Sequence, residues 1–475
     1  MRLRNLRLVS AVVLLAAACA TAPAPDPRIR LSRLIDEQVA LSPFDHALWG
    51  IHVEEEDGTV VYSRNGALLM IPASNRKLFT TALVESCFAL DSTIPTELLI
   101  EGEVGGGVLV GNVIVKGWGD PSFAGRYDEG VREVRLAPFP EGLRARGIER
   151  VLGSVLGDGS AFDRDVLHGT WQFEDLGTPW QTPVDALAFN ENVVGVFFRM
   201  PECGRPEITT DPPFVRAVAD IDCGERKRLI LASDATNTVS VTGTLEGPAE
   251  RTEIELVSIR DASLYAAQGI HDLLTGNGIA IENPPRAGTA SRSTERVALI
   301  ESPPLAELLA TVMKPSQNLY ADAMLKRVGG GGPEPASFER ALEIERLFLT
   351  GEVGIDPTEF SFADGSGLSV RNLVTPRAIV KLLRWMDAPP RRGANAVIFA
   401  IPGEQEGTLR RRLPGLERTM RGKTGTLTGV NALSGILTGS GGNVRYFSVV
   451  VNHHAAGSSR ATAIIDAIVH EIARF

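Results

Sequence analysis

Three short strings contain the residues with which this chain could carry out nucleophilic chemistry. They are Ser74-Asn75-Arg76-Lys77, Ser316-Gln317-Asn318 and Lys423-Thr424-Gly425. In this order, S-x-x-K, S-x-N and K-T-G supply a serine nucleophile, an amine partner, a proton relay and a cation for a substrate carboxylate. Lysine is rare here, with 7 among 48 basic residues, so a serine meets a lysine three positions later by chance about 1.5 % of the time.

The order of the strings carries more information than any one of them. S-x-N also occurs as Ser63-Arg64-Asn65, and only the later copy follows Ser74. Taken singly, each residue has a structural alternative: Ser74 as a helix N-cap, Ser316 and Asn318 as polar loop residues, and Lys423 as an exposed strand residue. The ordered set favours a catalytic function.

The expected chemistry assigns a role to each side chain. A serine hydroxyl attacks only when a base takes its proton, and Lys77 can do this only as a neutral amine. Burial or a nearby cation lowers a lysine pKa, and we expect Lys423 to be that cation. Ser316 would relay a proton to the leaving amine, while Asn318 would either bind the substrate amide or fix Lys77.

Substrate binding is expected around the third string. The backbone N–H groups of Ser74 and Thr426 would form an oxyanion hole. Lys423 would attract a substrate carboxylate, and Thr424, Gly425 and Thr426 would bind the substrate along a strand edge.

The elements that must position these residues follow from hydrophobic periodicity. Residues 48–62 alternate about Asp57-Gly58 and predict a hairpin. Residues 74–90 predict a helix that begins at Ser74 and places Lys77 one turn away on the same face. Further helices are predicted at 305–312, 319–328, 338–349, 379–386 and 463–475, and strands at 431–438 and 445–452. The fold class is therefore an α/β sandwich.

A β-rich insert is expected to divide this sandwich between the first and second strings. The chain from 94 to 286 contains short strands separated by turn residues. The predicted organisation is a signal peptide at 1–18, a lipidated cysteine and linker at 19–27, the first part of the catalytic domain at 28–93, the insert at 94–286 and the second part at 287–475.

The N-terminal residues predict export. Arg2, Arg4 and Arg7 precede an apolar run too short to span a bilayer, and small residues lead up to Cys19. This arrangement resembles a bacterial lipoprotein processing site, although an ordinary signal peptide cut nearby is the alternative. In an oxidising compartment Cys203 and Cys223 could form a disulfide, whereas the helical spacing of Cys87 predicts a buried thiol.

Composition excludes several classes of partner. A formal net charge of −10 without a dense basic track argues against nucleic acid. The histidines are scattered and form no H-E-x-x-H string, so no metal and no cofactor is expected. A membrane would be contacted only through the N-terminal lipid.

Two further segments carry a resemblance to a known family. The stretch Asp364-Gly365-Ser366-Gly367-Leu368-Ser369 with Asn372, and the stretch 189–192 (F-N-E-N), resemble segments of the low-molecular-mass class C penicillin-binding proteins, which are D-Ala-D-Ala carboxypeptidases/endopeptidases. The resemblance implies the penicillin-recognising serine transferase/hydrolase fold. It also implies an acyl-enzyme at Ser74 on peptidoglycan stem peptides and covalent inhibition by β-lactam antibiotics. Together with the export signal, the expected localisation is the periplasm of a Gram-negative-type bacterium, with a lipid anchor at Cys19.

Two alternatives stay open from the residues alone. A serine β-lactamase-like hydrolase shares the three strings, but that class is compact and leaves no room for the long separation of Ser74 from Ser316. A non-catalytic peptidoglycan-binding lipoprotein could keep the cleft for recognition. The residues do not separate carboxypeptidase from endopeptidase action.

Overall fold

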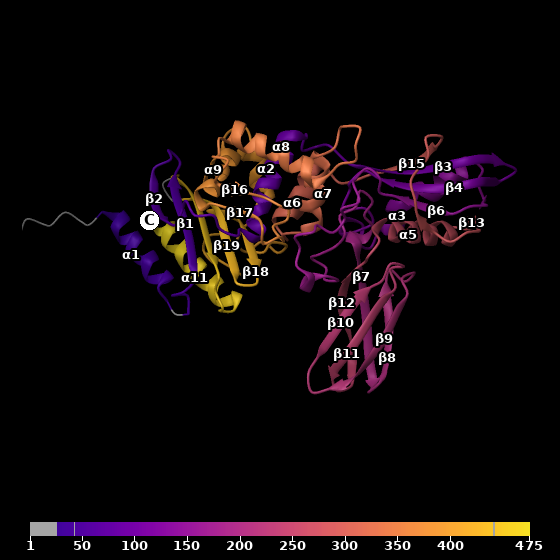
Figure 1. Ribbon diagram of the computed structural model, residues 1–475, viewed down its shortest axis with the longest axis horizontal. Helices are drawn as coiled ribbons and strands as arrows, with labels where there is room; N and C mark the ends of the chain where they lie inside the picture. The colour runs from indigo at the N-terminus through magenta and orange to yellow at the C-terminus, as the bar shows by residue number, and fades with distance from the viewer. Residues whose placement is uncertain (1–25, 42, 440–441) are drawn as a thin grey trace, which may run out of the picture.

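The computed structural model describes residues 26–41, 43–439 and 442–475 (Figure 1). The predicted signal peptide at 1–18 and the lipidated Cys19 lie outside the described residues. Within the described ranges, no helix is both long and apolar enough to cross a bilayer. Figure 1 shows a block of sheet and helices on the left and the insert on the right, which extends downward as a separate set of strands.

One antiparallel sheet forms the centre of the left-hand block, with five strands in the order β18-β19-β20-β1-β2. The strands are β1 (Leu48–Glu55), β2 (Val60–Arg64), β18 (Met420–Leu427), β19 (Val430–Thr438) and β20 (Val444–Asn452). The hairpin of β1 and β2 about Asp57-Gly58 is confirmed, and Gly58 has the positive φ of 89° that favours glycine. Strands from both ends of the chain therefore form one sheet.

Helices cover both faces of this sheet (Figure 1). Because side chains alternate along a strand, β19 contributes to two cores: Leu433 faces α1 and α11, whereas Ala432 faces the other helices. On the first face lie α1 (Pro27–Val39) and α11 (Ser458–Arg474). On the second side lie α2 (Lys77–Cys87), α6 (Leu305–Met313), α7 (Asn318–Val328), α8 (Phe338–Phe348), α9 (Pro376–Asp387) and α10 (Arg392–Ile398). The α/β sandwich is confirmed.

Short elements connect these helices and line the site described below. They are the 3₁₀ turns η1 (Ala73–Arg76), η2 (Arg126–Asp128), η3 (Phe173–Asp175) and η4 (Asn190–Asn192), the π-helical turn η5 (Leu349–Val353), and the paired strands β16 (Phe360–Ser361) and β17 (Leu373–Val374).

The first part of the insert is a seven-stranded sheet with three helices. Its strands are β3 (Pro95–Gly105), β4 (Val108–Gly117), β5 (Arg150–Val151), β6 (Val155–Asp158), β13 (Ala280–Ile281), β14 (Arg286–Ala287) and β15 (Glu295–Glu301). Its helices are α3 (Arg132–Leu136), α4 (Pro138–Ala145) and α5 (Ala262–Gly276).

The boundary predicted at 286 is too early. β15 pairs with β3, with Glu301 opposite Pro95, so the chain enters and leaves the insert at one place. We therefore propose that the insert runs from 94 to 301 and that the second part of the catalytic domain begins at 302. The insert is also less purely β than predicted, because α5 spans 15 residues.

The second part of the insert consists of two three-stranded sheets. One contains β7 (Val193–Glu202), β8 (Arg205–Asp211) and β12 (Ala249–Ser258), and the other contains β9 (Ala217–Gly224), β10 (Arg228–Ser233) and β11 (Val239–Glu246). A disulfide joins Cys203, in the turn between β7 and β8, to Cys223 on β9, with their Cα atoms 5.3 Å apart. Cys87 is exposed rather than buried, because it lies at the end of α2 where the helix leaves the core.

Candidate active site

The three strings meet at one cleft. Ser74 lies in η1, which runs directly into α2 at Lys77, while Ser316 precedes α7 and Lys423 lies on β18. The cleft has a volume of about 750 Å³, and its walls include Ser74, Ser316, Asn318, Thr424, Gly425 and Thr426. The hydroxyl of Ser74 caps neither η1 nor α2, so the N-cap alternative does not apply. Lys423 is fully buried and is not an exposed strand residue.

The amine of Lys77 is held by three oxygen atoms. Its Nζ lies 2.6 Å from Oδ1 of Asn318, 2.7 Å from the carbonyl oxygen of Ser366 and 3.0 Å from Oγ of Ser74. The first two atoms act as acceptors here. A neutral amine that donates its two N–H bonds to them directs its lone pair at the Ser74 hydroxyl. Of the two expectations for Asn318, the structure therefore shows the one in which it fixes Lys77.

Burial makes the neutral form of Lys77 accessible. The side chain is fully buried, and this desolvation lowers its pKa from 10.5 to about 8, although the carboxylates of Asp322 and Asp364 oppose the change. Arg76 is a nearby cation that lowers this pKa further. Burial and the charge of Lys77 lower the pKa of Lys423, and because repulsion between two ammonium groups acts on both, this interaction also includes the predicted effect of Lys423 on Lys77.

A second amine and hydroxyl pair faces the first. Lys423 donates from Nζ to Oγ of Ser316 at 2.7 Å and to the carbonyl oxygen of Thr424 at 3.0 Å. Ser316 has a left-handed backbone, with φ of 69°, an unusual conformation for a residue other than glycine. Such strain is found where the surrounding structure must aim a side chain, and here the hydroxyl is aimed at Lys423.

The edge of β18 passes close to the turn that carries Ser74. A Cβ atom at Gly425 would lie 2.7 Å from the carbonyl oxygen of Pro72 and 3.1 Å from the backbone nitrogen of Ser74, so only glycine fits. Because β18 is the edge strand, the backbone groups along its outer side are not used by the sheet. The N–H groups of Ser74 and Thr426 are thus brought to the same cleft.

A loop that the strings do not include supports Lys77. Asp364 accepts hydrogen bonds from the backbone N–H groups of Gly367 (2.8 Å) and Ser369 (2.7 Å) and from Nδ2 of Asn372 (2.8 Å). These contacts shape the 364–369 loop, whose Ser366 carbonyl oxygen accepts from Lys77. Within the sequence, only the family resemblance pointed to this loop.

Asp322, on α7, also holds the 364–369 loop in place. Its Oδ1 accepts from the backbone N–H groups of Gly365 (2.7 Å) and Ser366 (2.9 Å). Burial, together with the negative charge of Asp364, raises the pKa of Asp322 to about 7. No sequence pattern singled out this residue.

A buried ion pair anchors the first string. The guanidinium of Arg76 donates to both carboxylate oxygens of Glu345 on α8, at 2.7 and 2.6 Å. The side chains of Arg76 and Glu345 are 0 % and 1 % exposed. The variable positions of S-x-x-K are therefore structural, and Asn75 likewise donates to Oγ of Ser434 on β19 at 2.7 Å.

The insert contributes part of the cleft through residues 168–180, which we call the strap. Thr170 donates from Oγ1 to Oγ of Ser369 at 2.6 Å, and Trp171 donates from Nε1 to Oδ2 of Asp364 at 2.9 Å. Asn318 donates from Nδ2 to the carbonyl oxygen of Trp180 at 2.8 Å. The strap also places Gln172, Glu174, Asp175 and Trp180 on the wall of the cleft.

A second contact from the insert reaches the S-x-N string. Glu191, within the 189–192 stretch, accepts from Nε2 of Gln317 and from the hydroxyl of Tyr320, both at 2.9 Å. Asn190, Glu191 and Asn192 all have positive φ. The insert and the catalytic helices are therefore joined on both sides of Asn318.

The described residues contain no group of three or more His, Cys, Asp or Glu side chains that could hold a metal ion. Where the three strings meet, the reactive groups are the hydroxyls of Ser74 and Ser316 and the buried amines of Lys77 and Lys423, with the amide of Asn318 beside them.

Known proteins similar to this chain were found by sequence and by structure. Residues 31–474 match the family described as D-Ala-D-Ala carboxypeptidase 3 (S13). A D-alanyl-D-alanine carboxypeptidase from Actinomadura sp. (strain R39) is 28% identical over 490 residues, which cover 98% of this chain and 88% of the relative.

Two solved structures share the fold over most of the chain. Penicillin-binding protein 4 from Haemophilus influenzae matches with a TM-score of 0.82 at 24% identity, covering 93% of this chain and 99% of that one. The same protein in complex with a β-lactam matches with a TM-score of 0.77 at 23% identity, covering 93% and 99% of the two chains. The similarity thus includes the insert as well as the sheet and helices around the cleft.

Proposed function

Because the chain belongs to the D-Ala-D-Ala carboxypeptidase 3 (S13) family, we propose that it removes the terminal D-alanine of peptidoglycan stem peptides through an acyl-enzyme at Ser74. The observation that carries the proposal is the buried amine of Lys77, 3.0 Å from the Ser74 hydroxyl and held by two further acceptors. This pairing of nucleophile and base is what acyl transfer by serine requires.

Acylation uses two pairs of side chains, Lys77 with Ser74 and Lys423 with Ser316. Oγ of Ser74 attacks the carbonyl carbon of the penultimate D-alanine while Lys77 takes the hydroxyl proton. The N–H groups of Ser74 and Thr426 stabilise the negative oxygen of the tetrahedral intermediate. When the C–N bond breaks, Ser316 gives its proton to the leaving amine and recovers one from Lys423, 2.7 Å away.

Hydrolysis of the ester completes the cycle. Before this step Lys77 releases to solvent the proton that it took from Ser74, and Lys423 takes one up from solvent, so Lys77 is neutral again. Water then attacks the acyl carbon, Lys77 accepts one of its protons, and Oγ of Ser74 leaves and is reprotonated from Lys77. Lys423, Thr424 and Thr426 would bind the terminal carboxylate of the substrate in the first step. A β-lactam would acylate Ser74 in the same way, but its leaving amine stays tethered to the acyl group and hinders the entry of water.

Intact mass spectrometry of the protein with benzylpenicillin tests this proposal. We expect one adduct that persists for hours on the wild type and is absent from Ser74→Ala. Ser63→Ala is the matched control, because Ser63 belongs to the other S-x-N string and bonds to His52 on the sheet. No adduct with rapid penicillin loss would support the β-lactamase alternative, and no adduct without loss would support the non-catalytic wall-binding alternative.

Endopeptidase action is a second activity that the same site could carry out. We propose that the same acyl-enzyme forms on cross-linked peptides, since the bond cleaved also follows a D-alanine. Release of monomers from purified cross-linked muropeptide dimers would support it. Hydrolysis of pentapeptide monomers with intact dimers would limit the protein to carboxypeptidase action.

Localisation is also a proposal. Residues 1–18 would direct export to the periplasm, and Cys19 would carry a lipid anchor after cleavage. Metabolic labelling with a fatty-acid probe tests this, because label is expected on the wild type and not on Cys19→Ser. Label that persists on Cys19→Ser would refute the assignment.

A further inference from the structure

A second cleft lies in the insert, with a volume of about 930 Å³. None of its wall residues belongs to the catalytic cleft. Ligand sites commonly have volumes of roughly 300–1,000 Å³ and are frequent at boundaries between domains. This cleft has such a position, because Pro335 from the catalytic helices forms part of its wall.

The walls of the cleft are held by backbone contacts. Segment 159–166 is joined to the 335–336 loop by two hydrogen bonds, from the N–H of Asp163 to the carbonyl oxygen of Ala336 and from the N–H of Ala336 to that of Ala161, both 2.9 Å long. Gly159, after β6, lies so close to the Asp185 carboxylate that a Cβ atom would overlap it. The cleft is therefore preformed.

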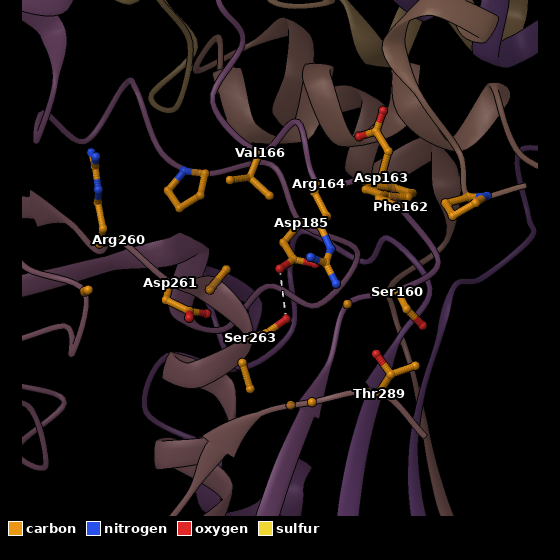
Figure 2. Close-up of a pocket in the computed structure, with 18 residues that line it drawn as sticks. Ser160, Phe162, Asp163, Arg164, Val166, Asp185, Arg260, Asp261, Ser263 and Thr289 are labelled. Carbon is orange, nitrogen blue, oxygen red and sulfur yellow. Dashed lines mark hydrogen bonds between the residues drawn. The ribbon is translucent and has the colours of Figure 1, made fainter. Parts of the chain in front are cut away.

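The acidic side chains of the cleft are already engaged. Asp163 pairs with a buried lysine, and Asp261 accepts a backbone N–H bond as the N-cap of α5. Asp185 accepts from the hydroxyl of Ser263 at 2.9 Å, the dashed contact in Figure 2.

The two basic side chains on the wall of this cleft are arginines. Arg164 and Arg260 are both exposed, and neither guanidinium makes a hydrogen bond or ion pair with a residue that the structure describes. Figure 2 shows Arg164 directed into the cleft, while Arg260 stands at the far end of the wall. Two unpaired guanidiniums in one cleft favour an elongated ligand with carboxylate groups, which arginine binds through paired hydrogen bonds.

One stretch of chain connects the two clefts. Residues 159–166 and 183–185 line the second cleft, and residues 172–180 between them line the catalytic cleft. A polymer with repeated peptides could therefore place one peptide in each cleft at the same time.

We propose that the second cleft binds a carboxylate-bearing stem peptide of the peptidoglycan strand whose neighbouring peptide occupies the catalytic cleft. The inference rests on the proposed function of that cleft. Arg164 and Arg260 bind carboxylates of the second peptide, and the Asp185 carboxylate accepts from one of its amide N–H groups. Binding at two clefts raises the effective concentration of the polymer at Ser74, an advantage that a short soluble peptide does not receive.

The test measures retention of the protein on purified insoluble peptidoglycan after benzylpenicillin has acylated Ser74 and blocked the catalytic cleft. We expect the acylated wild type to be retained, and the double variant Arg164→Gln, Arg260→Gln to bind about a hundredfold more weakly, which is about tenfold for each of the two charge-assisted contacts removed. Arg30→Gln is the matched control, because Arg30 is an exposed arginine of α1 on the opposite side of the molecule. It should bind as the wild type does.

Two results would overturn the inference. One is equal retention of the acylated wild type and the double variant. The other is a loss of about tenfold in Arg30→Gln, which removes one charge where the double variant removes two, because total charge alone would then decide binding. Intact mass spectrometry tests the proposed function separately, because no penicillin adduct would form on the wild type if that function were wrong. In that case the second cleft is still tested, by comparing the retention of the double variant with that of Arg30→Gln without penicillin.

Discussion

The base role of Lys77 predicts how acylation depends on pH. A lysine accepts a proton only when neutral, so the rate constant for acylation by penicillin should rise as pH increases through the pKa of Lys77. That pKa is lowered by burial to about 8. We therefore expect a rise of about tenfold between pH 7 and pH 9, with the midpoint near pH 8.

The size of the pKa change shows how much the protein environment increases the neutral fraction of Lys77. At pH 7, a lysine with a pKa of about 8 is neutral in about 9 % of molecules, whereas one with a pKa of 10.5 is neutral in about 0.03 %. The protein environment, with burial as its largest contribution, thus increases the reactive fraction about 300-fold, equivalent to about 3 kcal/mol at 1.36 kcal/mol per pKa unit.

Stopped-flow acylation with a fluorescent penicillin, from pH 6 to pH 9 at constant ionic strength, measures this profile. Asp322→Asn provides the discriminating variant. Asp322 raises the pKa of Lys77, so its loss should move the midpoint to lower pH, and the amide oxygen can still accept from the 365–366 backbone. Lys423 is shifted by burial and by Lys77, so a profile set by Lys423 would not respond directly to this change. A flat profile, or a midpoint that Asp322→Asn leaves unmoved, would refute the reasoning.

Three further predictions follow from contacts around the cleft. Trp171→Phe removes the hydrogen bond from the indole N–H of the strap to Asp364 in the 364–369 loop. In steady-state assays, kcat/KM on a pentapeptide substrate should therefore fall about tenfold. An unchanged kcat/KM would show that the strap is not needed to position the loop. Glu345→Gln leaves the buried charge of Arg76 unpaired and should lower the free energy of unfolding, measured in urea, by about 3 kcal/mol. Replacing both residues by apolar ones should restore most of this lost stability. Gly425→Ala should nearly abolish penicillin acylation while the protein remains folded by circular dichroism, because the added methyl would enter the space beside the Ser74 backbone.

Local patterns were sufficient for much of the fold. The hairpin of β1 and β2 follows from alternation about Asp57-Gly58, and the helices α6, α7, α8, α9 and α11 follow from apolar spacing, whereas the short helix α10 was not predicted. The boundary at 286 was wrong because β15 is recognised as part of the insert only through its pairing with β3, about two hundred positions earlier in the chain. Cys87 was misplaced for a related reason, since helical spacing identifies a face but not where along the helix the core ends.

Glu345 and the strap had no sequence signal of their own. Glu345 lies 269 positions from Arg76, and the strap reaches Asp364 across 193 positions. No spacing rule relates residues so far apart, because only the packing of α8 and of the insert brings them together.

By itself, the sequence determined which reactive groups exist, their order along the chain and the periodicity of the elements that carry them. These are local properties, set by residue type and by neighbours a few positions away. Only the tertiary structure decided that Lys77 is buried with a lowered pKa, that Ser366 and Asn318 orient its lone pair, and that the insert forms one wall of the cleft. Desolvation and hydrogen bonding depend on atoms within a few ångströms, and in this protein those atoms come from distant parts of the chain.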